Sequence, residues 1–555
     1  MSGGGSLPRT AERRRAASRP PGSYAEFLAN GRVRTANVPM SVVPSLMLPE
    51  IRPGEVSQLA VIDLGSNTAR LAIFEATGEG GLRTIYEVKE VPRLGKGVRK
   101  DLSLSPAAVE RGLATLVRFS RHLTVMGNPP TIAVATSAVR DAPNGQAFVE
   151  RIARRTGILM RVIDGEEEAR LGYLGVASTW ELDRDLIADL GGGSIQLAST
   201  RDGHLDRSTS LPLGALRLTQ EFLDHDPPKR RELESAEEYV RERLGAASLP
   251  RASERLRIFG VGGTIRSLAR VAMELREYPV QRVHGYPLSQ RDLEVLEGIL
   301  FEMSASQRRE VPGISAARAD VIVAGLIVVQ ALLRRMDKDE LLVTGHGIRE
   351  GAAVERLAIP VPASQEVLAF RSVTAAARGM GFSLVHGEQV RRLALALFDR
   401  LQPRYGWTDN DRLVLSVASW MHDVGTVVDA WHHPQHSAYL IRNLANLSLS
   451  DRDAVLASLV AYLHEGDEMP EGWAKTWRAI LTPGDLQVAR QLGTIVYFAE
   501  TLEGARLNLS LPRGSQRLRL EPHRNVGATV PPRAVERLRK PIERVFELEL
   551  VAPDE

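Results

Sequence analysis

Apolar residues alternate between the spacing of buried strands and the spacing of helices over most of this chain. Residues 59–63 form an apolar run that ends in an acid, and residues 70–74 form a second run after a short polar turn. Residues 105–123 carry apolar side chains at helical spacing, with Ser105 as the N-cap and a proline after it. Strands and helices then alternate to about residue 355, which predicts an α/β body.

The pattern changes after about residue 360. Residues 365–505 are mostly helical by spacing and contain six of the twelve histidines. The last part predicts a strand at 517–520, a helix at 534–545 and a strand at 546–551. We therefore expect an N-terminal extension, two lobes, a helical domain and a small strand–helix–strand module. The expected boundaries of these parts are 1–56, 57–180, 181–358, 359–512 and 513–555.

The N-terminal extension is basic and lacks steady periodicity. Residues 1–54 contain eight arginines and three glutamates, a charge of +5, whereas the whole chain carries +3. The rest of the chain is thus slightly acidic, and we expect it to bind no specific nucleic acid. We expect residues 1–56 to be largely disordered, because prolines interrupt them throughout. The alternative is an arm for an anionic partner, carried by Arg13, Arg14 and Arg15.

Two features of composition narrow the class of protein further. The chain contains no cysteine, which excludes disulfides and thiolate metal ligands and fits a cytoplasmic location. The longest apolar run, residues 321–333, is too short to cross a membrane and is flanked by charged residues. We therefore expect a buried helix there and no membrane association.

A turn sequence occurs twice, 126 residues apart. Residues 63–68 read DLGSNT, residues 189–194 read DLGGGS, and each copy lies between two apolar strands. Backbone N–H groups and hydroxyls of such turns bind anions, and an aspartate at the strand end can hold Mg²⁺. A tight hairpin alone would also use glycine, but two matching copies favour a phosphoryl-transfer site between two lobes. The candidate phosphate-binding residues are Ser66, Asn67, Thr68, Gly191, Gly192, Gly193 and Ser194, and the candidate metal ligands are Asp63 and Asp189.

A third glycine turn occupies residues 260–264 and follows a predicted strand at 256–259. We expect a helix to begin at Ile265, and helix N-termini attract phosphate. Gly262, Gly263 and Thr264 are therefore further candidates for phosphate binding. The alternative is an ordinary connection between a strand and a helix.

Acidic and basic residues follow two other strands of the first lobe. Glu166, Glu167 and Glu168 open a predicted helix, where the helix dipole favours acids in any case. One of them can activate water for attack on phosphorus, but their spacing does not say which one. Arg140 can neutralise phosphate oxygens, although an ordinary surface arginine would look the same.

Together these motifs resemble the Ppx/GppA family of exopolyphosphatases and guanosine pentaphosphate phosphohydrolases. Residues 62–67, 135–144, 165–170, 189–194, 260–264, 313–320 and 347–351 carry the resemblance. It implies the two-lobed, ribonuclease H-like fold shared by actin, sugar kinases and heat-shock chaperone ATPases. It also implies that Glu168 is the catalytic base and can contact the metal, that Asp189 binds the metal, and that Arg140 contacts phosphate. Gly345-His346 departs from the pattern, because Ser-Asp is expected there.

The helical part resembles the HD-type domain of longer family members. His386, the pair His422-Asp423, and then His433, His436 and His464 follow the order of HD phosphohydrolases. The resemblance implies a metal site formed by His386, His422, Asp423 and Glu500, where Glu500 replaces the usual aspartate. The alternative is an all-α domain that has lost its metal and serves dimerisation and substrate docking.

The resemblance implies Mg²⁺-dependent hydrolysis of the terminal phosphoanhydride bond of inorganic polyphosphate, with Mn²⁺ as the alternative cation. The first alternative is 5′-phosphohydrolysis of guanosine pentaphosphate (pppGpp), although no guanine-binding motif is recognisable. A kinase of the same fold and a non-catalytic polyphosphate or alarmone sensor are the weaker alternatives. We expect a homodimer, again from the resemblance.

Overall fold

The computed structural model describes residues 57–552, apart from 79, 98–101, 362–363, 446, 467–471, 505–506 and 523–530. The expected extension over residues 1–56 lies outside the described residues, so its expected disorder stays a prediction. Among the described residues, no helix has the length and apolar character needed to cross a membrane.

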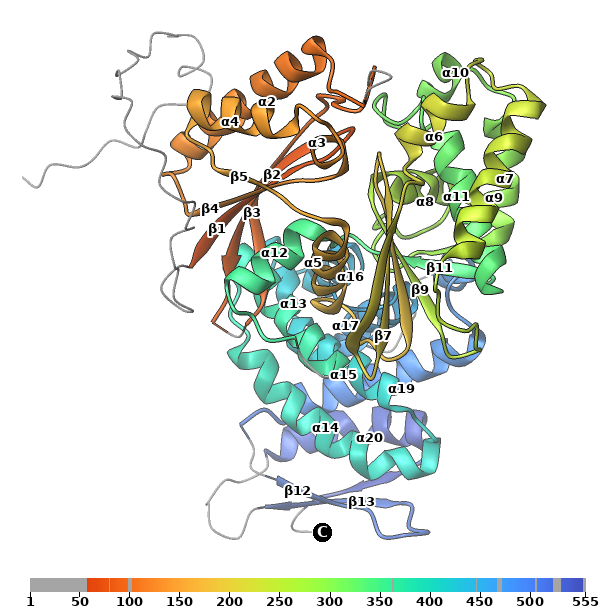
Figure 1. Cartoon of the computed structure of the whole chain (residues 1–555). Helices are drawn as coiled ribbons and strands as arrows, with labels where there is room; N and C mark the ends of the chain where they lie inside the picture. The colour runs from red at the N-terminus through yellow and green to blue at the C-terminus, as the bar shows by residue number, and fades with distance from the viewer. Residues whose placement is uncertain are drawn as a thin grey trace, which may run out of the picture. The chain divides into compact units, whose positions relative to one another are not determined.

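The first lobe is built on a five-stranded mixed sheet (Figure 1). Its strands are β1 (Gln58–Leu64), β2 (Ala69–Ala76), β3 (Leu82–Glu90), β4 (Thr131–Ala135) and β5 (Met160–Val162). Their order is β3-β2-β1-β4-β5, and β1 pairs antiparallel with β2 and parallel with β4. The predicted strands at 59–63 and 70–74 are therefore confirmed as the central hairpin of this sheet.

Successive residues of β1 face opposite sides of the sheet, which explains its continuous apolar sequence. Ala60, Ile62 and Leu64 join a buried core on one face, and Leu59 and Val61 join another core on the other face. The first core includes residues of α2 (Pro106–Val125) and α4 (Gly145–Thr156), and the second includes residues of α5 (Gly165–Ala177) and α12 (Ile348–Arg356). The expected N-cap is present, since the side chain of Ser105 accepts a hydrogen bond from the backbone N–H of Ala108.

The second lobe repeats the topology of the first. Its strands are β6 (Asp185–Leu190), β7 (Ile195–Arg201), β8 (His204–Leu211), β9 (Arg257–Val261), β10 (Pro287–Ser289) and β11 (Glu340–Val343). They follow the order β10-β11-β9-β6-β7-β8, so β8-β7-β6-β9-β11 corresponds strand by strand to β3-β2-β1-β4-β5. The two mixed sheets thus confirm the duplicated α/β architecture that the repeated turn indicated.

Helices of the second lobe pack on its sheet. They are α6 (Ala215–Phe222), α7 (Arg230–Ala246), α8 (Gly263–Leu275), α9 (Gln290–Leu300), α10 (Ala305–Arg309) and α11 (Ile322–Met336). The apolar run at 321–333 lies in α11 except for its N-cap Val321, and nearly every side chain of the run is buried. The expectation of a buried helix is confirmed.

The part that follows is mainly helical. It consists of α13 (Gln365–Met380), α14 (Val385–Tyr405), α15 (Asp409–Met421), α16 (His433–Asn443), α17 (Asp451–Tyr462), α18 (Trp473–Trp477) and α19 (Pro483–Thr501). Two short 3-10 helices, η1 (Val424–Val427) and η2 (Leu463–Glu465), follow α15 and α17. One buried core joins these helices, and the relation of this part to HD domains stays a prediction.

The end of the chain forms a three-stranded sheet that shares this core. Strand β13 (Arg517–Pro522) pairs antiparallel with β12 (Leu507–Ser510) and parallel with β14 (Glu549–Val551). The sheet therefore begins before the boundary expected at residue 513. Helix α20 (Pro532–Phe546) includes Phe546, so the prediction that a strand starts there is wrong; the fully buried Phe546 completes the apolar face of the helix.

The helical part contacts both lobes through ion pairs of different burial. On the side of the second lobe, Arg282 forms a 2.9 Å ion pair with Asp451, and both side chains are almost fully buried. Arg282 also donates to the backbone carbonyls of Leu447 and Leu449. On the side of the first lobe, Arg378 lies 3.5 Å from Glu75 and is half exposed.

Candidate active site between the glycine turns

The two repeated turns lie against each other. Each is closed by the same backbone hydrogen bond, from Gly65 N–H to Thr68 O at 3.0 Å and from Gly191 N–H to Ser194 O at 2.9 Å. A Cβ atom added to Gly192 would lie only 3.2 Å from Cβ of Ser66, so the two turns are in close contact. The structure therefore brings the two copies of the motif to one place.

A cavity opens between these turns and the third glycine turn. Most of the residues predicted for the site line this cavity. They are Asp63, Ser66, Asn67, Thr68, Glu168, Asp189, Gly191, Gly192, Ser194, Gly262 and Gly263.

Arg140, Gly193 and Thr264 were also predicted for the site, but they support the cavity from behind rather than line it. Arg140, at the end of α3 (Ser137–Arg140), donates to the carboxylate of Glu168 at 2.9 Å. Gly193 packs against Ser66 and Ser137, whose hydroxyls lie 2.8 Å apart. Thr264 is fully buried, and its hydroxyl accepts a 3.1 Å hydrogen bond from Arg318. All three thus hold residues that do face the cavity.

Buried carboxylates line the cavity. Burial raises the pKa of Asp63, and it raises the pKa of Asp189 to about 7, with a further rise caused by the nearby charge of Asp63. Burial also raises the pKa of Glu168 to about 8, against the opposing effect of Arg140. Buried carboxylates that raise one another's pKa are stabilised by a divalent cation, which prefers oxygen ligands. The donor set at Asp63 and Asp189 therefore fits Mg²⁺.

Four arginines also line the cavity, and the sequence patterns did not indicate them. They are Arg70, Arg266, Arg318 and Arg349. Burial lowers the pKa of Arg266 to about 9 and that of Arg318 to about 10, so each buried guanidinium would gain from an anion. Arg70 could have been predicted from the register of the first hairpin, because it lies directly opposite Asp63. A cavity that is lined by both buried carboxylates and guanidiniums fits a metal-bound phosphate chain.

Comparison with known proteins identifies the family. The sequence matches the Ppx/GppA phosphatase family over residues 73–358 and domain III of Ppx/GppA phosphatases over residues 370–475. The chain belongs to the Ppx/GppA phosphatase family. Exopolyphosphatase 1 of Mycobacterium tuberculosis strain H37Rv is 32% identical over 305 residues, which cover 54% of this chain and 88% of that protein. Exopolyphosphatase 1 of Mycobacterium leprae is 31% identical over 304 residues, with 54% and 89% covered.

Solved structures agree with this assignment of the two lobes to the Ppx/GppA family. The crystal structure of an exopolyphosphatase from Cytophaga hutchinsonii shares 26% sequence identity and superposes with a TM-score of 0.51. The match covers 55% of this chain and 99% of that protein. An exopolyphosphatase-like protein with 30% identity gives a TM-score of 0.50 and covers 54% of this chain and 97% of its own length.

The three acids at the start of α5 have different surroundings. Glu166 is exposed, and Glu167 forms two hydrogen bonds with Arg161 at 2.6 and 2.7 Å. Glu168 is only 5% exposed and, unlike the other two, lines the cavity. These surroundings make Glu168 the candidate for water activation.

The third turn differs from the sequence-based prediction. Strand β9 continues through Gly260 and Val261, and α8 already begins at Gly263, not at Ile265. Gly262 connects the strand to the helix as a single residue with φ +105°, a conformation that glycine adopts readily and other residues rarely do. A Cβ atom at this position would lie 2.4 Å from the carbonyl oxygen of Leu190, so a side chain has no room there.

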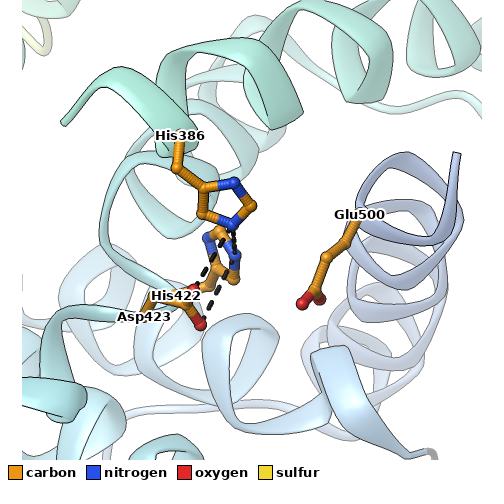
Figure 2. Close-up of side chains that lie close together, drawn as sticks. All are labelled: His386, His422, Asp423 and Glu500. Carbon is orange, nitrogen blue, oxygen red and sulfur yellow. Dashed lines mark hydrogen bonds and ion pairs between the residues drawn. The ribbon is translucent and has the colours of Figure 1, made fainter. Parts of the chain in front are cut away.

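The residues predicted for the HD-like site lie together in the helical part. Figure 2 shows His386, His422 and Asp423 in contact, with the carboxylate of Glu500 pointing toward them from the other side. One ligand atom from each of the four lies within 4.8 Å of the others. This cluster is separate from the residues that line the cavity between the turns.

Proposed function

We propose that this protein is an exopolyphosphatase that removes the terminal phosphate of inorganic polyphosphate. The proposal rests on one observation above all, the contact of two equivalent glycine turns beside a cavity lined by buried acids and four arginines. A chain of phosphates needs many donors along its length, and the turns and guanidiniums supply them. The relatives named exopolyphosphatase support the choice of substrate.

In this proposal, the turns and the arginines bind and orient the phosphate chain. Backbone N–H groups of both turns, the hydroxyls of Ser66 and Ser194, and the guanidiniums of Arg70 and Arg318 donate hydrogen bonds to phosphate oxygens. Asp63 and Asp189 would hold Mg²⁺, which supplies charge neutralisation at the terminal phosphate. Most of the rate enhancement then comes from positioning and from charge stabilisation.

Glu168 acts as the general base. It takes a proton from a water molecule whose oxygen attacks the terminal phosphorus, and the bond from that phosphorus to the bridging oxygen breaks. The bridging oxygen stays with the shortened chain, and orthophosphate is released. Arg140 holds the carboxylate of Glu168 through the 2.9 Å hydrogen bond and favours its ionised form, as a base requires.

The test compares phosphate release from polyphosphate and from pppGpp by the purified full chain with Mg²⁺. We expect release from polyphosphate, a loss of about 10²–10⁴-fold in Glu168→Gln, and no loss in the exposed Glu166→Gln control. Polyphosphate binding should persist in Glu168→Gln, because the phosphate-binding groups remain. Near-normal turnover of Glu168→Gln, or release from pppGpp alone, would contradict the proposal.

A further inference from the structure

A short helix of the first lobe, α3, contacts three parts of the proposed site. The hydroxyl of Ser137 at its start lies 2.8 Å from that of Ser66 in the first glycine turn. Arg140 at its end donates to the carboxylate of Glu168. Asp141, the C-cap of α3, reaches the second lobe. Helix α3 therefore links the first turn, the proposed general base and the other lobe.

The contact of Asp141 with the second lobe is an ion pair. Nη2 of Arg217 donates to Oδ2 of Asp141 at 2.5 Å, and Arg217 belongs to α6 of the second lobe (Figure 1). The other oxygen of this carboxylate, Oδ1, lies 3.5 Å from Nε of Arg140. One carboxylate thus pairs with two guanidiniums, one from each lobe.

Arg140 uses different nitrogens for its different partners. Its Nη1 donates to Oε2 of Glu168 at 2.9 Å and to the carbonyl oxygen of Ile163 at 3.1 Å, while its Nε faces Asp141. A guanidinium is planar and holds its nitrogens in a fixed arrangement, so the position of Asp141 affects the direction in which Nη1 points. The orientation of Arg140, and with it that of Glu168, therefore depends on Asp141.

Arg217 is joined to the second glycine turn through the backbone of α6. The N–H groups of Leu216 and Arg217 donate to the carbonyl oxygen of Gly192 at 2.9 and 3.0 Å. The N–H group of Ala215 donates to the carbonyl oxygen of Gly191 at 3.1 Å. Because these hydrogen bonds attach the start of α6 directly to the turn, Arg217 keeps a defined position relative to it.

We propose that Arg217 and Asp141 are positioning residues for Glu168, an inference that rests on the proposed hydrolysis of polyphosphate. A series of contacts joins the second turn to the general base through Gly192, Arg217, Asp141, Arg140 and Glu168. The turns hold the terminal phosphate, and Glu168 activates the water that attacks it. This series of contacts therefore fixes the distance between the phosphorus atom and the base, although the two are held by different lobes.

Arg217 and Asp141 act through other groups rather than on the substrate. Among the described residues, those that line the cavity include Glu168 and Gly192 but neither Arg217 nor Asp141. The side chains of Arg217 and Asp141 are 28% and 37% exposed, and ion pairs this exposed contribute little to the stability of a fold. Loss of the pair should therefore disturb the geometry of the base without unfolding the chain.

The test measures phosphate release from polyphosphate with Mg²⁺ by the purified full chain and by its Arg217→Gln and Asp141→Asn variants. We expect kcat to fall about 10–10²-fold in each variant, because a misplacement of about 1 Å at the reacting groups costs up to about 10²-fold in rate. We expect KM to stay close to the wild-type value, because the phosphate-binding groups remain. Arg217→Lys, which keeps the positive charge, should recover part of the loss.

A combined variant distinguishes this series of contacts from a general effect on the fold. Residues that act through one path give losses that do not add, so Arg217→Gln should lower kcat no further in a chain that already carries Arg140→Ala. The control is Glu355→Gln. Glu355 pairs at 2.5 Å with Arg170, which lies two residues after Glu168 on the same helix, and this ion pair is also partly exposed. Glu355→Gln should keep the wild-type kcat.

Normal kcat in Arg217→Gln and Asp141→Asn, beside a loss in Glu168→Gln, would overturn this inference and leave the proposed function in place. A full further loss of kcat on top of Arg140→Ala, or an equal loss in Glu355→Gln, would also overturn it. A wild-type chain that releases no phosphate would overturn the proposed function and this inference with it. Circular dichroism of each variant separates loss of kcat from loss of fold.

Discussion

Arg140 donates a 2.9 Å hydrogen bond to the buried carboxylate of Glu168. Burial raises the pKa of Glu168 to about 8, and the hydrogen bond from Arg140 opposes that rise. The ion pair therefore decides how much of the proposed base is ionised near neutral pH.

Arg140→Ala should shift the acidic limb of the pH–rate profile to higher pH. Without the guanidinium the pKa of Glu168 rises further, so deprotonation needs a higher pH, by about one to two pH units for a charge-assisted hydrogen bond. The measurement is kcat/KM for phosphate release between pH 5 and 10. Arg154→Ala is the control, because Arg154 is exposed on α4. An unshifted acidic limb in Arg140→Ala would contradict this coupling.

Without cations, the stability of the fold should fall as pH rises. Asp189 and Glu168 have folded-state pKa values of about 7 and about 8, well above the ordinary values of 3.8 and 4.5. Their contribution to stability is complete below about pH 4 and is lost as the pH rises through 7 and 8. We expect Tm in chelator to fall between pH 5 and 9, and Mg²⁺ to raise it most at the alkaline end. Asp189→Asn should make Tm less dependent on pH. An equally steep fall of Tm in that variant would show that Asp189 does not cause the pH dependence.

Gly262→Ala should destabilise the protein and weaken substrate binding. Its φ of +105° is unfavourable for alanine, and the new Cβ would collide with the carbonyl oxygen of Leu190. We expect a loss of about 1–3 kcal/mol in the free energy of unfolding, measured with urea. Gly245→Ala in α7 is the control, since a Cβ there meets open space and favours the helix by a few tenths of a kcal/mol to about 1 kcal/mol.

Arg318→Ala should weaken the binding of the phosphate chain more than it slows turnover. A guanidinium–phosphate contact contributes about 1.5–3 kcal/mol, which corresponds to a KM increase of about 10–100-fold. Thr264→Val keeps the shape of the site but removes the 3.1 Å hydrogen bond to Arg318, so it should raise KM less. The exposed Arg309→Ala is the control. An unchanged KM in Arg318→Ala would show that this arginine does not bind the phosphate chain.

Asp451→Ala should destabilise the chain by about 3–5 kcal/mol, because it leaves the buried Arg282 without a counter-charge. Denaturant unfolding measures the loss. Glu549→Ala is the matched control, since Glu549 pairs with Arg517 on the surface and such pairs contribute at most about 1 kcal/mol. Similar losses of unfolding free energy in the two variants would show that burial does not increase the contribution of the Arg282–Asp451 pair to stability.

The glycine turns were predictable from the sequence because their signal is local. Each needs only an apolar strand, an acid and small residues in a row, and residues 63–68 and 189–194 both form the expected hairpin. Arg266 and Arg318 were not predictable in this way, since Arg266 of α8 and Arg318 of the turn before α11 reach the cavity only after these two segments pack together. Strand β12 has just four residues, too few for an alternating pattern to stand out.

The choice among three adjacent glutamates also needed the tertiary structure. Glu166, Glu167 and Glu168 share one helical turn, and only the direction of α5 relative to the sheet decides which of them is buried. In the helical part, the resemblance implied four metal-binding candidates, and the structure places one ligand atom from each within 4.8 Å of the others. The homodimer and the cytoplasmic location stay predictions.

The helical part forms a buried ion pair with the second lobe, Arg282–Asp451, and a half-exposed ion pair with the first lobe, Arg378–Glu75. The two ion pairs differ in how far solvent reaches them. Water and dissolved ions reach the Arg378–Glu75 pair but not the Arg282–Asp451 pair. Added salt should therefore weaken the contact with the first lobe and leave the contact with the second lobe almost unchanged, because mobile ions screen only charges that solvent reaches.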